Sequence, residues 1–309
     1  MLLDISRSIC YPDNRLFIGP KFGEYDRLHF KEKEMTNSFQ KSERLIMDAV
    51  EKRLDGRVPK TILLLGSGLN EVEDDLESLA SFPYESLPGF PTSNVLSHNN
   101  RLVLGRSGKE PVICLSGRVH YYEGPEKLEV WKNVLRFLRR LGAERLFLTA
   151  AVGSLRAEIK PGELVLISDQ INFTGWSPLI GPNDDAIGPR FLDVSNIYDS
   201  GLRKKIRESA TAIELDLHEG VYTCVVGPCF ETKAEARMLA GLGGDIVGMS
   251  VVPEAIIGRH CGYQIAGLAV VTNYCPGLSD EHFDHDSVIS QSKGTAKKVS
   301  RLVKHFLQS

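Results

Sequence analysis

Short runs rich in Val, Ile and Leu alternate along this chain with segments that carry helix signals, and this alternation constrains the fold more than any other feature. Continuous apolar runs of this length are typical of strands that are buried on both faces of a sheet. Helices between such strands cover the two faces, so the pattern predicts an α/β fold with a largely parallel sheet. The expected strands are residues 61–65, 111–115, 145–150, 164–167, 221–226, 245–248 and 264–272.

Several helix boundaries are marked by residues with a known physical role. Pro125 suits the first turn of a helix, where its missing N–H has no intrahelical partner, and Gly142 suits the end of the same helix. Thr232 and Glu235 form a T-x-x-E capping box that opens another helix. Pro253 lies near the start of a further one. These signals place helices directly beside the expected strands.

The two ends of the chain differ in pattern. Apolar residues recur with a helical period from Ser38 to Leu54, and again near the C-terminus, where Val299, Leu302, Val303 and Phe306 share one face. Residues 1–34 mix aromatic and charged residues without a clear period. They are either an extension packed on the surface or a segment that precedes an alternative start at Met35. A chain of 309 residues allows two domains or one large α/β domain.

Composition excludes several classes of function. A formal charge of -3, without any long basic run, disfavours nucleic acid as the main partner. The six cysteines form no C-x-x-C pair, which favours reduced thiols over a zinc ribbon or a redox site. The longest uncharged stretch, residues 261–279, is interrupted by polar residues and glycines, so no membrane span is expected. With no signal-peptide core at the start, we expect a cytoplasmic protein.

The segments that follow the expected strands are unusually polar and rich in glycine. In an α/β sheet the ligand lies beyond the carboxyl ends of the strands, so we expect these segments to form one rim. Ser67, Arg118, His120 and Ser250 offer the hydroxyl and N–H donors of an oxyanion site. Taken alone, a segment such as Gly66-Ser67-Gly68 is more often a turn between strand and helix than an anion site, and Arg118 and His120 are equally well explained as solvated surface residues.

Other side chains of the same rim suit a heterocycle and a sugar. Glu231 is an acceptor placed just before a helix start, although a capping role also explains it. Asn273 offers both a donor and an acceptor, although it also suits a turn. Side chains able to enclose a sugar and a flat ring are Tyr122, Trp176, Phe230 and Met249. The acidic and histidine-rich segment 282–286 lacks the spacing of a metal site, and a helix cap explains it.

Five motifs occur in the order seen in the trimeric purine nucleoside phosphorylases, and the chain resembles that family over about residues 45–307. They are G-S-G-L at 66–69, G-R-x-H-x-Y-E-G at 117–124, G-P-x-F-E-T at 227–232, V-G-M-S-x-V-P-E at 247–254 and T-N at 272–273. The resemblance implies a single-domain fold over residues 35–309, in which a twisted mixed sheet is partly closed as a barrel and flanked by helices. It also implies a homotrimer.

The resemblance assigns roles to individual positions. It implies a phosphate site of Ser67, His98, Arg118, His120, the backbone of Ala151 and Ser250. It implies a ribose site of Tyr122, Met249 and His285, and a base site of Phe230, Glu231, Val247 and Asn273. Asn273, Glu231 and His120 are the expected catalytic residues, and Trp176 the expected contribution to a neighbouring subunit. Inorganic phosphate is then a co-substrate, and no metal or organic cofactor is expected.

The implied activity is phosphorolysis of purine nucleosides, with 6-oxopurines preferred because Glu231 and Asn273 match their donors and acceptors. Three positions depart from the family pattern: Ala150 replaces an amide, Val152 adds bulk to the pocket wall and Tyr274 changes the loop beside the base. Two alternatives therefore stay open. One is a methylthioadenosine or methylthioinosine phosphorylase, and the other is a purine-binding paralogue without catalytic activity.

Overall fold

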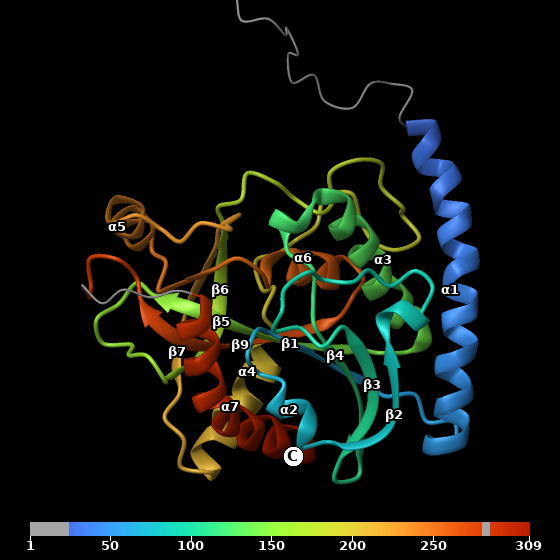
Figure 1. The fold of residues 1–309 in the computed structure, drawn as a ribbon, viewed down its shortest axis with the longest axis horizontal. Helices are drawn as coiled ribbons and strands as arrows, with labels where there is room; N and C mark the ends of the chain where they lie inside the picture. Colours follow the sequence, from blue (N-terminus) through green and yellow to red (C-terminus); the bar gives the residue numbers. More distant parts are fainter. Residues whose placement is uncertain (1–24, 280–284) are drawn as a thin grey trace, which may run out of the picture.

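One mixed β-sheet forms the centre of the protein. The structure, a computed structural model, describes the backbone of residues 25–279 and 285–309 and the side chains of residues 38–279 and 286–309. Within these ranges nine strands follow the order β2-β3-β4-β1-β5-β8-β7-β6-β9 (Figure 1). They are β1 (Thr61–Leu65), β2 (Glu77–Pro83), β3 (Arg101–Ser107), β4 (Glu110–Ser116), β5 (Arg145–Ser154), β6 (Leu164–Asn172), β7 (His218–Cys224), β8 (Ile246–Gly248) and β9 (Gln264–Tyr274).

The sheet closes on itself around β5. This strand pairs with β1, β8 and β9, so the ring β5-β8-β7-β6-β9 returns to its starting strand. Strands β4, β1, β5 and β9 run parallel to one another, whereas β8 is antiparallel to β5 and β6 is antiparallel to β9. The expectation of a mixed sheet partly closed as a barrel is confirmed. Parallel pairing joins β4, β1, β5 and β9 in one group and β6, β7 and β8 in another, and the two groups run antiparallel where they meet, so the sheet is mixed rather than largely parallel.

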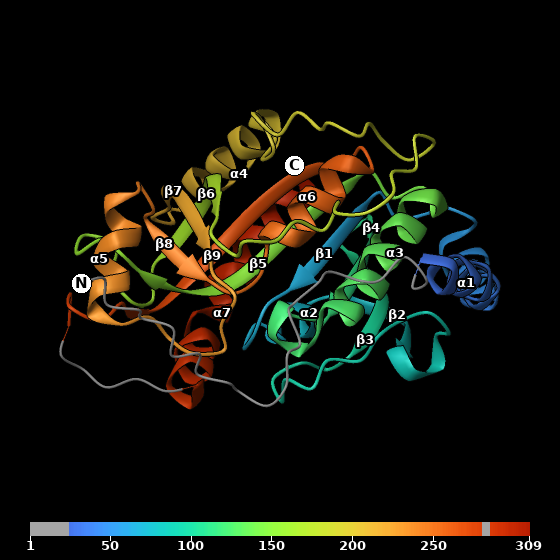
Figure 2. The ribbon, with the colours of Figure 1, turned by 90° about the horizontal axis from the view of Figure 1, so that it is seen from above.

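Helices cover both faces of the sheet, as the strand pattern predicts (Figures 1 and 2). On β1, Ile62 and Leu64 join one hydrophobic core, and Leu63 and Leu65 join the other, because successive side chains of a strand point to opposite faces. Fully burying one such side chain contributes about 1.5–3 kcal/mol. The helices are α1 (Tyr25–Leu54), α3 (Pro125–Leu141) and α6 (Val252–His260) on the first face, α2 (Glu71–Asp74), α4 (Ser200–Ala212) and α7 (His285–Gln308) on the second, and α5 (Lys233–Gly241) over a smaller cluster.

The predicted helix boundaries at α3 and α5 are confirmed. Pro125 is the first residue of α3, and Gly142 ends it in a left-handed conformation with φ 114°. At α5 the Thr232 hydroxyl accepts from the Glu235 backbone N–H, and the Glu235 carboxylate accepts from the Thr232 backbone N–H. Each end satisfies backbone groups that lack partners inside the helix. Local sequence therefore fixes where these two helices start or stop.

Other boundaries differ from the predictions. Helix α1 begins at Tyr25, well before Ser38, so it runs through position 34 without a break in secondary structure. Strand β5 continues to Ser154, through residues expected to form a turn, because β8 and β9 supply partners there. Strands β2 and β3 and helix α4 were not predicted, and β2 is largely exposed and so lacks a continuous apolar run. Among the described residues, no helix combines the length and apolarity that a bilayer crossing requires.

Candidate active site

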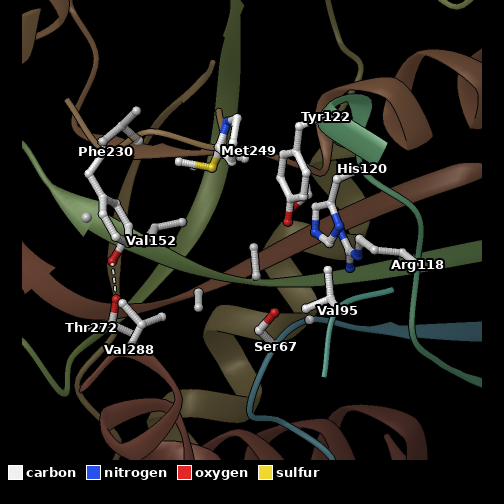
Figure 3. A pocket seen from close by; sticks show the side chains of 18 of the residues that line it. Ser67, Val95, Arg118, His120, Tyr122, Val152, Phe230, Met249, Thr272 and Val288 are labelled. Carbon is white, nitrogen blue, oxygen red and sulfur yellow. Dashed lines mark hydrogen bonds between the residues drawn. The ribbon is translucent and has the colours of Figure 1, made fainter. Parts of the chain in front are cut away.

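A cavity of about 430 Å³ opens at the carboxyl ends of β1, β4 and β5 and gathers most of the expected site residues (Figure 3). Its size lies within the range of small-molecule sites. In Figure 3, Ser67, Arg118 and His120 lie on one side, while Phe230, Val152 and Thr272 lie on the other. The expected residues that line it are Ser67, Arg118, His120, Tyr122, Ala151, Phe230, Glu231, Val247, Met249, Ser250 and Asn273.

The residues after strand β8 reach this cavity although β8 is antiparallel to β5. Val247 pairs with Gly153 near the end of β5, so the antiparallel chain after β8 runs back along β5 towards Ala151. Met249 and Ser250 follow immediately and enter the cavity. The strand ends were expected to form one rim because all the strands would be parallel, and for β8 this reason was wrong. The residues after β8 reach the cavity because β8 pairs with the last residues of β5 in the closed part of the sheet.

Ser250 is presented by a strained turn. The Val252 N–H donates to the Ser250 carbonyl at 2.7 Å, and the residue between them, Val251, has φ 67° and ψ -56°. A branched residue at positive φ costs about 1–3 kcal/mol, and such strain occurs mainly where function requires the geometry. The Ser250 backbone N–H also donates to the Tyr222 hydroxyl at 3.2 Å. The turn and this hydrogen bond together hold Ser250 just before the N-terminus of α6.

Arg118 is anchored beneath the cavity by backbone carbonyl groups. Its side chain is buried, and Nη2 donates to the carbonyls of Thr149 at 2.6 Å and Leu64 at 3.1 Å. These carbonyls belong to β5 and β1, so the guanidinium position is tied to the central sheet. Gly66, beside it, has no room for a side chain, because a Cβ atom there would lie 2.8 Å from the Thr149 carbonyl oxygen. The backbone at Gly66 therefore packs directly against β5 where it lines the cavity.

His98 lies behind Ser67 rather than in the cavity wall. Its Nε2 is 3.4 Å from the Ser67 hydroxyl, and its Nδ1 accepts from the Arg118 backbone N–H at 3.3 Å. Burial, assisted by nearby His120 and Arg118, lowers the pKa of His98 to about 3, so the ring is neutral at pH 7. Since Nδ1 is the acceptor, Nε2 carries the ring hydrogen and is a donor towards Ser67.

His120 is oriented by Glu123, a residue that the sequence reasoning did not select. Burial by itself raises the pKa of Glu123, but hydrogen bonds led by the one from His120 outweigh it and lower the pKa to about 2. The ionised carboxylate accepts from His120 Nδ1 at 3.1 Å, which leaves Nε2 for a ligand. The His120 ring also stacks on Tyr122, with centroids 4.9 Å apart. Glu123 stands in the G-R-x-H-x-Y-E-G motif, which was the available signal.

The other side of the cavity carries a carboxylate and an amide. Burial raises the pKa of Glu231. The Asn273 Oδ1 accepts from the Thr272 hydroxyl at 2.8 Å, and its Nδ2 donates to the Tyr274 carbonyl at 3.1 Å. One N–H of Asn273 thus stays available, because an amide nitrogen has two. Val152 lines the same wall with only 2% of its surface exposed, so the expected bulk at this position is present.

Trp176 and His285 are not among the described side chains that line this cavity. Trp176 does not line the cavity; it packs on Tyr121 of the same chain, with ring centroids 5.2 Å apart. The side chain of His285 lies outside the described residues, although its backbone begins α7. Val95 and Leu96 line the cavity but were not predicted, since nothing in their pattern distinguishes them from an ordinary loop. Among side chains 38–279 and 286–309, no three His, Cys, Asp or Glu residues are grouped to hold a metal.

Comparisons with known proteins identify the family of this chain. A family model described as the phosphorylase superfamily matches residues 60–308. A purine nucleoside phosphorylase of Geobacillus stearothermophilus is 41% identical over 251 residues, which cover 81% of this chain and 91% of that protein.

Two solved structures of schistosome purine nucleoside phosphorylase are also similar. The one from Schistosoma mansoni in complex with adenosine has a TM-score of 0.78 and 30% identity, and it covers 89% of this chain and 97% of that one. The second, in complex with hypoxanthine, has a TM-score of 0.77 and 31% identity over the same shares of the two chains. The chain therefore belongs to the phosphorylase superfamily, and within it to the purine nucleoside phosphorylases.

Proposed function

We propose that this cavity catalyses the phosphorolysis of purine ribonucleosides and deoxyribonucleosides, with 6-oxopurine nucleosides such as inosine and guanosine preferred. The products are the free base and ribose 1-phosphate or deoxyribose 1-phosphate. The observation that carries this proposal is one cavity with oxyanion donors on one side, lined also by the carboxylate of Glu231 and the amide of Asn273, whose chain neighbours Phe230 and Thr272 lie on the other side. A sugar between them contacts a phosphate and a purine at once. The purine ligands of the two schistosome structures support the same class of substrate.

At the oxyanion side, Ser67, Arg118 and Ser250 hold phosphate beneath the anomeric carbon, with the backbone of Ala151 beside them. The bond from C1′ to N9 breaks, and its electron pair leaves with the purine; the purine then takes up one proton from solvent, which balances the proton that hydrogen phosphate releases as it becomes the sugar phosphate. Positive charge develops on the sugar, where the phosphate stabilises it and then forms the new C1′–O bond. Holding both reactants in place lowers the barrier by up to about 7–11 kcal/mol in ideal cases.

The two histidines have opposite hydrogen-bonding roles at the phosphate, since one is a donor and the other an acceptor. His98 is neutral and has its hydrogen on Nε2, so it donates towards the Ser67 hydroxyl, which in turn faces the phosphate in the cavity. His120 has its hydrogen on Nδ1, held by Glu123, so Nε2 accepts the proton that remains on hydrogen phosphate. One donor and one acceptor therefore favour the dianionic form of phosphate in a fixed orientation.

At the other side, Asn273 donates its available N–H to purine N7, where negative charge gathers as the base leaves. Glu231 accepts from N1–H, and in guanosine also from the 2-amino group. Adenosine has no hydrogen on N1, so it leaves the carboxylate unpaired. Rejection of a substrate that leaves buried polar groups unpaired reaches about 10⁴-fold. Phe230 and Val247 pack against the purine.

The ribose and the quaternary arrangement complete the proposal. Tyr122 and Met249 enclose the sugar, and His285 binds its 5′-hydroxyl. The protein is a homotrimer in which Trp176 reaches the site of a neighbouring copy. Trp176 belongs to the long loop 173–196, and the exposed apolar side chains of this loop, Phe173, Ile180 and Phe191, support a contact of this kind. Phosphate is the nucleophile, so the proposed reaction requires neither a metal nor an organic cofactor. We also propose that the reaction takes place in the cytoplasm.

The test is a panel of inosine, guanosine, adenosine and methylthioadenosine, assayed with and without phosphate. We expect phosphate-dependent release of base, with inosine and guanosine the best substrates. A clear preference for methylthioadenosine would reverse the assignment of substrate. Binding of hypoxanthine without any turnover at saturating phosphate would instead support a purine-binding protein and refute the enzyme.

A further inference from the structure

A buried carboxylate that does not line the cavity lies next to Arg118. Glu254 is in the first turn of α6 and is 1% exposed, and Arg118 is also 1% exposed. Their closest charged atoms, Arg118 Nη1 and Glu254 Oε1, are 3.7 Å apart. This is close enough for an ion pair and too long for a hydrogen bond.

Both members of the pair keep hydrogen-bonding capacity. Within the described residues, Arg118 Nε and Nη1 and both Glu254 carboxylate oxygens have no hydrogen-bond partner. Nη2, in contrast, is fully occupied by the carbonyls of Leu64 and Thr149. The guanidinium is thus anchored at one nitrogen, paired in charge with Glu254, and still able to bind an oxyanion through its two other nitrogens.

The surroundings leave Arg118 as the partner of this carboxylate. Cys224 and Tyr198 are titratable groups near Glu254, and burial raises the pKa of each, with the Glu254 charge adding to the effect. Both are therefore neutral at pH 7. The N-terminal turn of α6 also favours an anion at this position. The only ion pair that the described residues form with Glu254 is the one with Arg118.

We propose that Glu254 is a positioning residue that acts through Arg118: it is the permanent counter-ion of this guanidinium and limits how much phosphate charge the guanidinium neutralises. This inference rests on the proposed function, in which phosphate binds Arg118. An uncompensated guanidinium in this buried place is costly, so Glu254 stabilises the free enzyme. Once phosphate binds, the two anions share one cation, and phosphate keeps more of its negative charge for the sugar.

The inference predicts an unusual combination of effects for Glu254→Gln, which keeps the shape and removes the charge. Phosphate loses a like-charged neighbour, so its dissociation constant and KM fall by about tenfold. The turnover number also falls by about tenfold, because a more strongly neutralised phosphate stabilises the sugar cation less. A merely structural residue behaves differently, since damage to the site weakens binding and slows turnover together.

The experiment measures binding of inorganic phosphate by calorimetry and by the phosphate-induced rise in melting temperature, together with kcat and KM for phosphate. Purification in phosphate followed by dialysis keeps Glu254→Gln folded at the start. Glu254→Asp restores the charge and is expected to return phosphate affinity to within about threefold of wild type. Glu73→Gln is the matched control, because Glu73 is a buried carboxylate paired with Arg101 away from the cavity, and it should leave phosphate affinity unchanged.

The outcomes separate this inference from the proposed function. Weaker or unchanged phosphate binding in Glu254→Gln, or a change of the same size in Glu73→Gln, would overturn the role of Glu254. If the variants show the predicted differences in phosphate affinity while the wild-type protein releases no base from any nucleoside, the proposed function is refuted and the role of Glu254 at the phosphate site stays supported.

Discussion

Replacement of Asn273 by alanine tests the proposed stabilisation of the leaving purine. The amide is held at both ends, since Oδ1 accepts from Thr272 and Nδ2 donates one N–H to the Tyr274 carbonyl. Its remaining N–H is the proposed donor to N7. In the intact nucleoside this bond is neutral and weak, whereas in the transition state it meets developing negative charge. Removing a fixed donor of this kind costs about 2.7–4 kcal/mol, or a factor of about 10²–10³ in kcat.

Steady-state kinetics with inosine at saturating phosphate give the required separation of kcat from KM. We expect Asn273→Ala to lower kcat by this factor while KM for inosine changes little. Asn133→Ala serves as the control, because Asn133 is an amide of α3 that does not line the cavity and whose Nδ2 donates to the Glu129 carbonyl at 3.2 Å. An unchanged kcat accompanied by a higher KM would refute the reasoning, since the contact would then be equally strong before and during bond cleavage.

Three further changes test other parts of the site. Glu231→Gln removes the anionic acceptor and should lower kcat/KM by about 10- to 100-fold, more for guanosine than for inosine, in a direct comparison of the two. Gly227→Ala puts a Cβ atom 2.3 Å from Met249 Sδ at a φ of +71°, so KM for nucleosides should rise while calorimetry finds unchanged phosphate binding. The pKa of Glu123 falls from 4.5 to about 2 on folding, so its stabilisation is present above pH 4.5 and lost as pH falls towards 2. Urea unfolding should therefore find Glu123→Gln less stable than wild type near pH 6, by a difference that shrinks on acidification.

Sequence reasoning located the site because its residues stand in short motifs at strand ends. Strand β1 has the predicted bounds, and the residues after it enter the cavity as expected. Arg118 and Asn273 lie far apart in the chain, yet the parallel pairing of β4, β1, β5 and β9 brings them to one edge. For these residues, short motifs and the rule that the carboxyl ends of parallel strands lie at one edge of the sheet were enough to predict the site.

Other features depend on contacts between distant segments, which no local pattern records. The direction of β8 is set by its pairing with the last residues of β5, and the positive φ of Val251 belongs to a turn between β8 and α6 that no local pattern indicates. Glu254 ends the V-G-M-S-x-V-P-E motif but received no role from the sequence, and only its distance to Arg118 indicates one. The start of α1 at Tyr25 was missed because residues 1–34 lack an apolar period.

The central claim is that phosphate and purine occupy opposite sides of the same sugar in one cavity. The most direct measurement is the product balance from inosine. We predict one ribose 1-phosphate for each hypoxanthine released and no release without phosphate. Free ribose as the sugar product, or hypoxanthine release at the same rate without phosphate, would contradict the account, because the nucleophile would then be water and the oxyanion side of the cavity would have another purpose.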